Sequence, residues 1–202
     1  MWHLKEHRRF FTYMTLLKDM LLVLAKALLS LLSLSGFMLA NALCSSGMGI
    51  ARFVALQMPE QVWTSRRKSY RQVGIIIAAS SSCYILYSVR LFYGESTRIY
   101  PLNLAVLIAL YTFILFGINL RGAIKLRYSE ALEAKALRGI SLSSTLLCFS
   151  LTQTAIMSAV HKEDYTASSA VAGIVFGSLA CLIGLFIIKD SYRCEHKKQM
   201  KP

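Results

Sequence analysis

The chain has 202 residues, of which 55% are hydrophobic and 16% are charged. Soluble domains have about 45–50% apolar and about 25% charged residues, so this composition argues against an ordinary soluble domain and predicts a membrane protein. The net charge of +13 lies in short clusters between apolar runs. That distribution favours a lipid bilayer with anionic headgroups as the partner and argues against nucleic acid.

The first predicted elements are a basic cytoplasmic N-terminus, residues 1–19, and an apolar helical segment, residues 20–58. Three interpretations of the second segment compete: an interfacial or re-entrant helix, a fifth span, and a removable signal sequence. The tripeptide at 40–42 resembles a cleavage site, but cleavage there would place the basic residues 51–71 outside the cell. We favour an embedded segment with both flanks cytoplasmic, bent near residues 35–36. Its polar stripe consists of Lys18, Lys26, Ser30, Ser33, Asn41, Ser45 and Arg52.

Four apolar runs with the length of a transmembrane helix follow in the predicted membrane domain, residues 59–188. These runs are residues 72–92, 101–120, 139–160 and 167–188, and each is bounded by charge or proline. No run alternates with period two, which argues against a strand barrel. The sequence therefore predicts an all-α, polytopic transmembrane helical bundle with four clear spans plus the membrane-embedded or interfacial N-terminal segment.

The basic clusters orient these spans. Residues 51–71, residues 121–138 and the tail at 189–202 are rich in lysine and arginine, whereas the connections near residues 95 and 163 are neutral or slightly acidic. The positive-inside rule places the three basic regions in the cytoplasm. We therefore expect a multi-pass protein of the cytoplasmic membrane with a cytoplasmic C-terminus. Residues 121–138 are further predicted to form a short cytoplasmic helix that rests on headgroups.

The last span has a smooth face formed by small residues. At about 100° per residue, these residues fall on a single narrow arc. They are Ala170, Gly173, Gly177, Ala180 and Gly184. An interior glycine costs a helix about 1 kcal/mol relative to alanine, and the small-x-x-x-small pattern compensates by allowing a second helix to approach closely. The sequence leaves open whether that helix belongs to the same chain, to another membrane protein or to a second copy.

The span at 139–160 carries a polar arc instead. The arc consists of Ser141, Ser144, Thr145, Cys148 and Thr152, with Gln153 about 100° from its centre. Hydroxyl groups often bond to their own helix, so the arc favours a packing role. The alternative is the polar lining of a cavity or pore. An unpaired amide would cost several kcal/mol in an apolar environment, so we expect Gln153 to have an interhelical partner or a water-filled pocket.

The sequence contains no recognised catalytic or metal-binding motif, such as GxSxG, HExxH or a phosphate-binding loop. The four runs also contain no Asp or Glu, which argues against a proton-coupled antiporter. The five cysteines are dispersed, and the pair Cys194 and His196 offers too few ligands for zinc. His161, Glu163 and Asp164 are typical of a hydrated loop. We therefore expect no enzyme activity, catalytic residue, metal or cofactor.

The passages FMLANALCSSGMGIARFVAL and LTQTAIMSA, with the small-residue final span, resemble small multi-pass membrane proteins of Gram-positive bacteria that have no established role. The resemblance implies a bacterial membrane location and transfers no functional residues. The sequence as a whole favours a non-enzymatic accessory or assembly subunit, such as a helper of a transporter or sensor. A small transporter or channel with a Ser/Thr/Gln-lined pathway is the alternative, and a membrane-bound enzyme ranks third.

Overall fold

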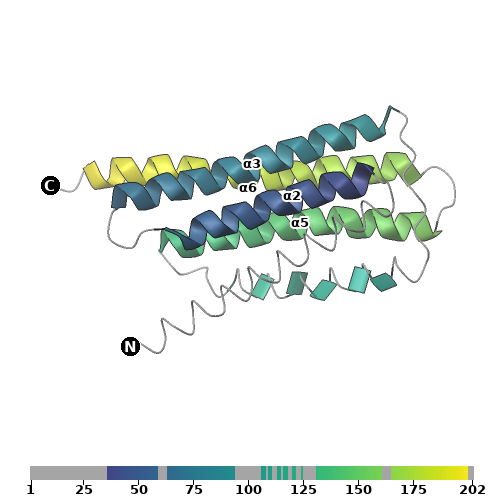
Figure 1. The fold of residues 1–202 in the computed structure, drawn as a ribbon, viewed down its shortest axis with the longest axis horizontal. Helices are drawn as coiled ribbons and strands as arrows, with labels where there is room; N and C mark the ends of the chain where they lie inside the picture. The colour runs from purple at the N-terminus through teal and green to yellow at the C-terminus, as the bar shows by residue number, and fades with distance from the viewer. Residues whose placement is uncertain are drawn as a thin grey trace.

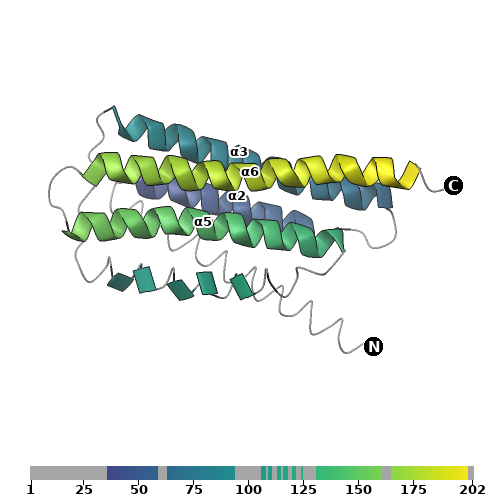
Figure 2. The ribbon, with the colours of Figure 1, turned by 180° about the vertical axis from the view of Figure 1, so that it is seen from behind.

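The computed structural model describes residues 36–58, 63–93, 131–160 and 165–199, with scattered helical positions between 106 and 124. The continuous helices in these ranges are α2 (Gly36–Leu56), α3 (Trp63–Leu91), α5 (Leu132–Val160) and α6 (Tyr165–Gln199). These helices lie side by side with their long axes nearly aligned (Figure 1, Figure 2). The predicted all-α fold is confirmed for this part of the chain.

Helices α3 and α6 form the antiparallel centre of the bundle. Near the start of α3, Arg67 bonds to Ser191 at the end of α6, while Ser88 near the end of α3 lies against Gly173. Helix α2 packs on α3 and α5, and α5 also packs on α6. The core therefore lies between the four helices.

The described helices extend beyond the predicted apolar runs. Helix α3 begins at Trp63, so residues 63–71, predicted to lie in a cytoplasmic connection, belong to it. Helix α5 begins at Leu132, so residues 132–138, predicted to end a separate short cytoplasmic helix, are helical but continuous with α5. Helix α6 likewise continues through most of the tail at 189–202. Lysine and arginine are good helix formers, and no proline interrupts these stretches. Hydropathy marks the part of a helix suited to lipid, whereas the helix itself continues into the polar region.

Two helices of the described part are long and apolar enough to cross a membrane: Ser65–Leu91 and Thr166–Arg193. They cover the predicted spans at 72–92 and 167–188. The run at 139–160 forms most of α5, which is not one of these two candidate spans. The four-span prediction is therefore met by two helices among the described residues. The predicted span at 101–120 lies mostly outside those residues.

The outward faces of α3 and α6 are largely apolar, and their inward faces combine small and polar residues with large apolar ones such as Val73, Ile77 and Ile187. Exposed large side chains include Ile75, Leu86, Val89, Val171, Val175, Leu182, Leu185 and Phe186. Ser81, Ser88, Ala170 and Ala180 are in contrast fully buried. Soluble monomers rarely expose contiguous apolar patches beyond a few hundred Å². This exposure of large apolar side chains is typical of helices whose outer surface contacts lipid or another apolar partner.

Helix α2 lies within the bundle and turns the described part of the predicted polar stripe inward, whereas the stripe residues Lys18, Lys26, Ser30 and Ser33 lie outside the described residues. Asn41 and Arg52 are buried and Ser45 is half-buried. The 21 residues of α2 give a length of about 30 Å, which equals the hydrocarbon thickness of a bilayer. The segment predicted at 20–58 is thus helical from Gly36 to Leu56, and its path through a membrane stays a prediction.

Candidate functional site

The smooth face of α6 packs against α3 within the chain. All five of its small residues are buried: Ala170, Gly173, Gly177, Ala180 and Gly184. A Cβ atom at Gly184 would lie 2.8 Å from the backbone nitrogen of Ala78 and 2.9 Å from the carbonyl oxygen of Gly74. Real Cβ atoms do not approach other atoms so closely. The two backbones are therefore in direct contact, at a place where each helix carries a glycine.

A buried hydrogen-bond network, which we call the Tyr84 cluster, lies further along this interface. It consists of Asn41, Tyr84, Ser88, Ser150 and Thr154, each no more than 1% exposed. The Tyr84 hydroxyl donates to Ser150 Oγ at 2.9 Å, and Asn41 is a second side-chain partner of Tyr84. Ser88 and Thr154 donate to the carbonyl oxygens of Tyr84 and Ser150 at 2.9 and 3.0 Å. The cluster therefore connects α2, α3 and α5.

Sequence reasoning did not select most of this cluster. Ser150 and Thr154 lie outside the polar arc predicted for 139–160, and Tyr84 was treated as part of an apolar run. One signal was present: Ser81, Tyr84 and Ser88 recur with helical spacing on α3. A polar stripe on an otherwise apolar helix indicates an inward face, because lipid offers these groups no hydrogen-bond partner.

The predicted polar arc on α5 is only partly buried. Thr145, Cys148 and Thr152 are buried, whereas Ser141, Ser144 and Gln153 are partly exposed. The hydroxyls of Thr145 and Thr152 donate to the carbonyl oxygens four residues earlier, at 2.8 and 3.0 Å. Bonds of this kind satisfy a hydroxyl within its own helix.

Ser141 has an interhelical contact, because Arg52 Nη2 on α2 donates to its Oγ at 3.2 Å. Arg52 is buried inside the bundle, although the sequence placed it in a cytoplasmic connection. The partner predicted for the Gln153 amide stays a prediction.

The cysteines whose side chains the structure describes form no disulfide. Cys44 donates to the carbonyl oxygen of Ser80 at 2.9 Å, and Cys83, Cys148 and Cys181 form no disulfide. No group of three or more His, Cys, Asp and Glu side chains that could hold a metal occurs among the described residues. The residues at 161–164 and the side chains of Cys194 and His196 lie outside that part.

Charged groups connect three helices at the opposite end of the bundle from Ser88. Arg67 Nε donates to the Ser191 carbonyl oxygen at 2.8 Å, and the Tyr70 hydroxyl donates to Asp190 at 3.3 Å. Lys135 Nζ on α5 lies 3.8 Å from the same Asp190 carboxylate. Asp190 on α6 therefore accepts one contact from α3 and one from α5.

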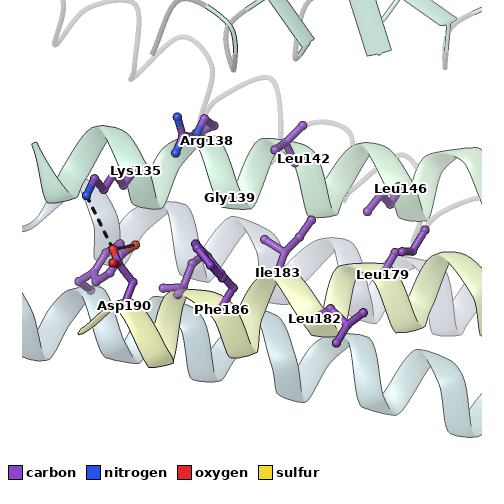
Figure 3. Close-up of a pocket in the computed structure, with 12 residues that line it drawn as sticks. Lys135, Arg138, Gly139, Leu142, Leu146, Leu179, Leu182, Ile183, Phe186 and Asp190 are labelled. Carbon is purple, nitrogen blue, oxygen red and sulfur yellow. Dashed lines mark hydrogen bonds and ion pairs between the residues drawn. The ribbon is translucent and has the colours of Figure 1, made fainter. Parts of the chain in front are cut away.

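A cavity of about 740 Å³, the α5–α6 groove, opens beside this charged end. Lys135, Arg138 and Asp190 line one end of the groove. Leucines from both helices, including Leu142 and Leu179, line the rest, as Figure 3 shows. The groove is thus polar at one end and apolar along its length.

The fold and these contacts define an all-α protein with two helices suited to a membrane. No known protein family matches the chain, and no curated protein matches it.

Proposed function

We propose that the chain is an integral protein of the bacterial cytoplasmic membrane that acts without catalysis, as an accessory or assembly subunit. The observation that carries the proposal is the outer surface of α3 and α6, which exposes many large apolar side chains, while Ser81, Ser88 and Ser169 are buried. The Tyr84 cluster and the backbone-bonded threonines of α5 support a packing role for the interior.

We further propose that α3, α5 and α6 cross the membrane, with the charged end of the bundle in the cytoplasm, and that α2 belongs to an embedded segment whose two flanks are cytoplasmic. The basic residues at the ends of α3, α5 and α6 support this orientation, because they gather where the positive-inside rule expects them. They include Arg66, Arg67, Lys68, Arg71, Lys135, Arg138, Lys189 and Arg193.

Thiol labelling tests this topology. Five full-length variants would each carry one cysteine in a background without the native ones: Lys5→Cys, Val62→Cys, Thr97→Cys, Glu130→Cys and Glu163→Cys. In intact cells we expect an impermeant maleimide to label only positions 97 and 163, and in inverted vesicles only positions 5, 62 and 130. Equal labelling of positions 62 and 97 from one side would contradict a membrane crossing by α3.

Copurification of the full-length protein with its membrane partners tests the accessory role. A tagged chain extracted in polymer-bounded lipid discs is expected to retain a membrane-protein partner, or a second copy, at a fixed ratio across preparations. A control with charged residues on the exposed apolar face, Val175→Arg with Leu182→Arg, should lose that association. Recovery of the wild type only as a lone monomer would contradict an accessory role.

A small transporter or channel is the second candidate function. The observation that favours it is a set of buried hydroxyls without a hydrogen-bond partner among the described residues: Ser81, Ser143 and Ser169. Buried hydroxyls of this kind often bond to ordered water, which a solute pathway requires.

Solute flux separates the two functions. For an accessory protein, we expect proteoliposomes with the wild type to shrink under a glycerol gradient at the rate of empty liposomes. Stopped-flow light scattering measures this rate. If the wild type shrinks faster and Gln153→Leu abolishes the difference while the protein stays folded, the pathway is supported and the accessory role is contradicted. Thr166→Ala, a polar-to-apolar change on the partly exposed first turn of α6, serves as the control.

A further inference from the structure

We propose that the α5–α6 groove binds one anionic phospholipid of the cytoplasmic leaflet. Its phosphate would lie at Lys135 and Arg138, and an acyl chain would run along Leu142, Leu146 and Leu179. The proposal rests on the membrane location proposed above, because a bilayer lipid reaches the groove only if α5 and α6 lie in the membrane.

The charges at the end of the groove favour an anionic headgroup. Lys135, Arg138 and Asp190 line that end together, so two cations oppose one carboxylate. Asp190 also accepts a hydrogen bond from Tyr70, and its 3.8 Å contact with Lys135 positions the ammonium group at the mouth. Lys135 and Asp190 both remain partly accessible. Basic pockets between helices on the cytoplasmic side are a recognised way to hold acidic lipid headgroups.

The length of the groove matches one leaflet of a bilayer. From Lys135 to Leu146 along α5, a rise of 1.5 Å per residue gives about 16 Å. This distance is about half of the 30 Å hydrocarbon thickness. An acyl chain whose headgroup lies at the cationic end would therefore end near the bilayer midplane, beside the last leucines of the groove (Figure 3).

The composition of the groove favours a lipid over a free anion. A free phosphate would contact only the charged end and would leave the leucine-lined length unfilled. The volume of about 740 Å³ lies within the range of about 300–1,000 Å³ that is usual for ligand sites. Gly139, which has no side chain, lies between the charged end and the leucines.

Native mass spectrometry of the full-length protein tests the proposal in neutral detergent micelles that contain equal amounts of phosphatidylglycerol and phosphatidylcholine. We expect the wild type to retain one phosphatidylglycerol. The double variant Lys135→Gln with Arg138→Gln should lower this occupancy at least about tenfold, because each basic residue near an anionic lipid contributes about 1 kcal/mol. Asp190→Asn should raise it.

Two further variants separate the groove from general attraction to positive charge. Lys189→Gln is the matched control: Lys189 is exposed on α6 beside Asp190 and does not line the groove, so its loss should leave occupancy unchanged. Leu142→Trp fills the apolar part without changing charge and should lower occupancy. Circular dichroism of each variant verifies folding. If the double variant does not fold, Leu142→Trp still tests whether the lipid occupies the groove.

Several results would overturn the proposal. Equal losses for Lys189→Gln and the double variant would indicate diffuse attraction. Displacement of the lipid by millimolar inorganic phosphate would indicate a site for free anions. Photocrosslinking from Leu142→Cys to the chain itself or to a second copy, in place of lipid, would identify another occupant. A wild type that needs detergent but does not prefer phosphatidylglycerol would remove the lipid site alone, whereas a wild type monodisperse without detergent would remove the membrane function too.

Discussion

Gly184→Ala is expected to lower the free energy of unfolding by about 1–3 kcal/mol, the usual cost of overpacking. The added Cβ would lie 2.8 Å from the Ala78 nitrogen and 2.9 Å from the Gly74 oxygen. Both are backbone atoms, so no rotamer change can relieve the clash and α3 must move as a whole. Because α3 also holds Tyr84, that movement should disturb the hydrogen bond to Ser150 as well.

Two glycines provide graded controls for this substitution. A Cβ at Gly177 would meet only side-chain atoms, Cγ1 of Ile85 at 2.8 Å and Cδ1 of Tyr84 at 3.4 Å, so Gly177→Ala should cost less than Gly184→Ala, where backbone is in the way. A Cβ at Gly49 on α2 would meet no atom of the described residues within 4 Å, so Gly49→Ala should gain up to about 1 kcal/mol from helix propensity. Denaturant titration of the three variants in one detergent, followed by circular dichroism, gives the order. Equal stability of Gly184→Ala and Gly49→Ala would refute the close contact of α3 with α6.

Tyr84→Phe is expected to cost about 1–3 kcal/mol of unfolding free energy, because it leaves buried polar groups without their partner. Ser150 Oγ loses the donor at 2.9 Å, and Asn41 loses its contact with the same hydroxyl. The ring itself stays, so no cavity larger than one oxygen atom forms. The measurement is again denaturant titration in detergent.

A double-mutant cycle isolates the hydrogen bond within that cost. Combining Tyr84→Phe with Ser150→Ala should give a coupling energy of about 0.6 kcal/mol and at most about 1.7 kcal/mol, as for other interhelical bonds in membrane proteins. Tyr192→Phe is the matched control, because Tyr192 is 49% exposed near the end of α6 and its hydroxyl has only an exposed 3.5 Å contact with Arg71. A coupling energy of zero would show that the bond adds nothing to stability.

The sequence predicted which regions form the central helices, but not where those helices begin and end. Long apolar runs identified α3 and α6, because hydropathy responds directly to a lipid-facing surface. Hydropathy does not show that α3 already includes residues 63–71 or that α5 already includes residues 132–138, because the charged side chains there suit a helix as well as a loop. The start of a helix in the polar region depends on contacts such as Arg67 with Ser191, which lie 124 residues apart in the chain.

The candidate site was predictable only where the residue pattern of a single helix is enough to identify the buried face. The small residues of α6 recur on a single face, so their arc is visible in the sequence, and the structure places that face against α3. The bond between Tyr84 and Ser150 joins residues 66 positions apart on two helices. No periodicity within either helix encodes how α3 and α5 are rotated toward each other. The groove depends on the same relative rotation of α5 and α6.

The pairing of α3 with α6 has a consequence for biosynthesis. A ribosome adding roughly 5–20 residues per second needs about 4–15 s to translate the chain from Leu91 to Tyr165. With the membrane location proposed above, the hydroxyl-bearing face of α3 would be inserted during this interval while its main neighbour has not yet been made. Nascent chains that stop before α6 should therefore display unsatisfied polar groups to membrane quality-control proteases and be removed before they accumulate.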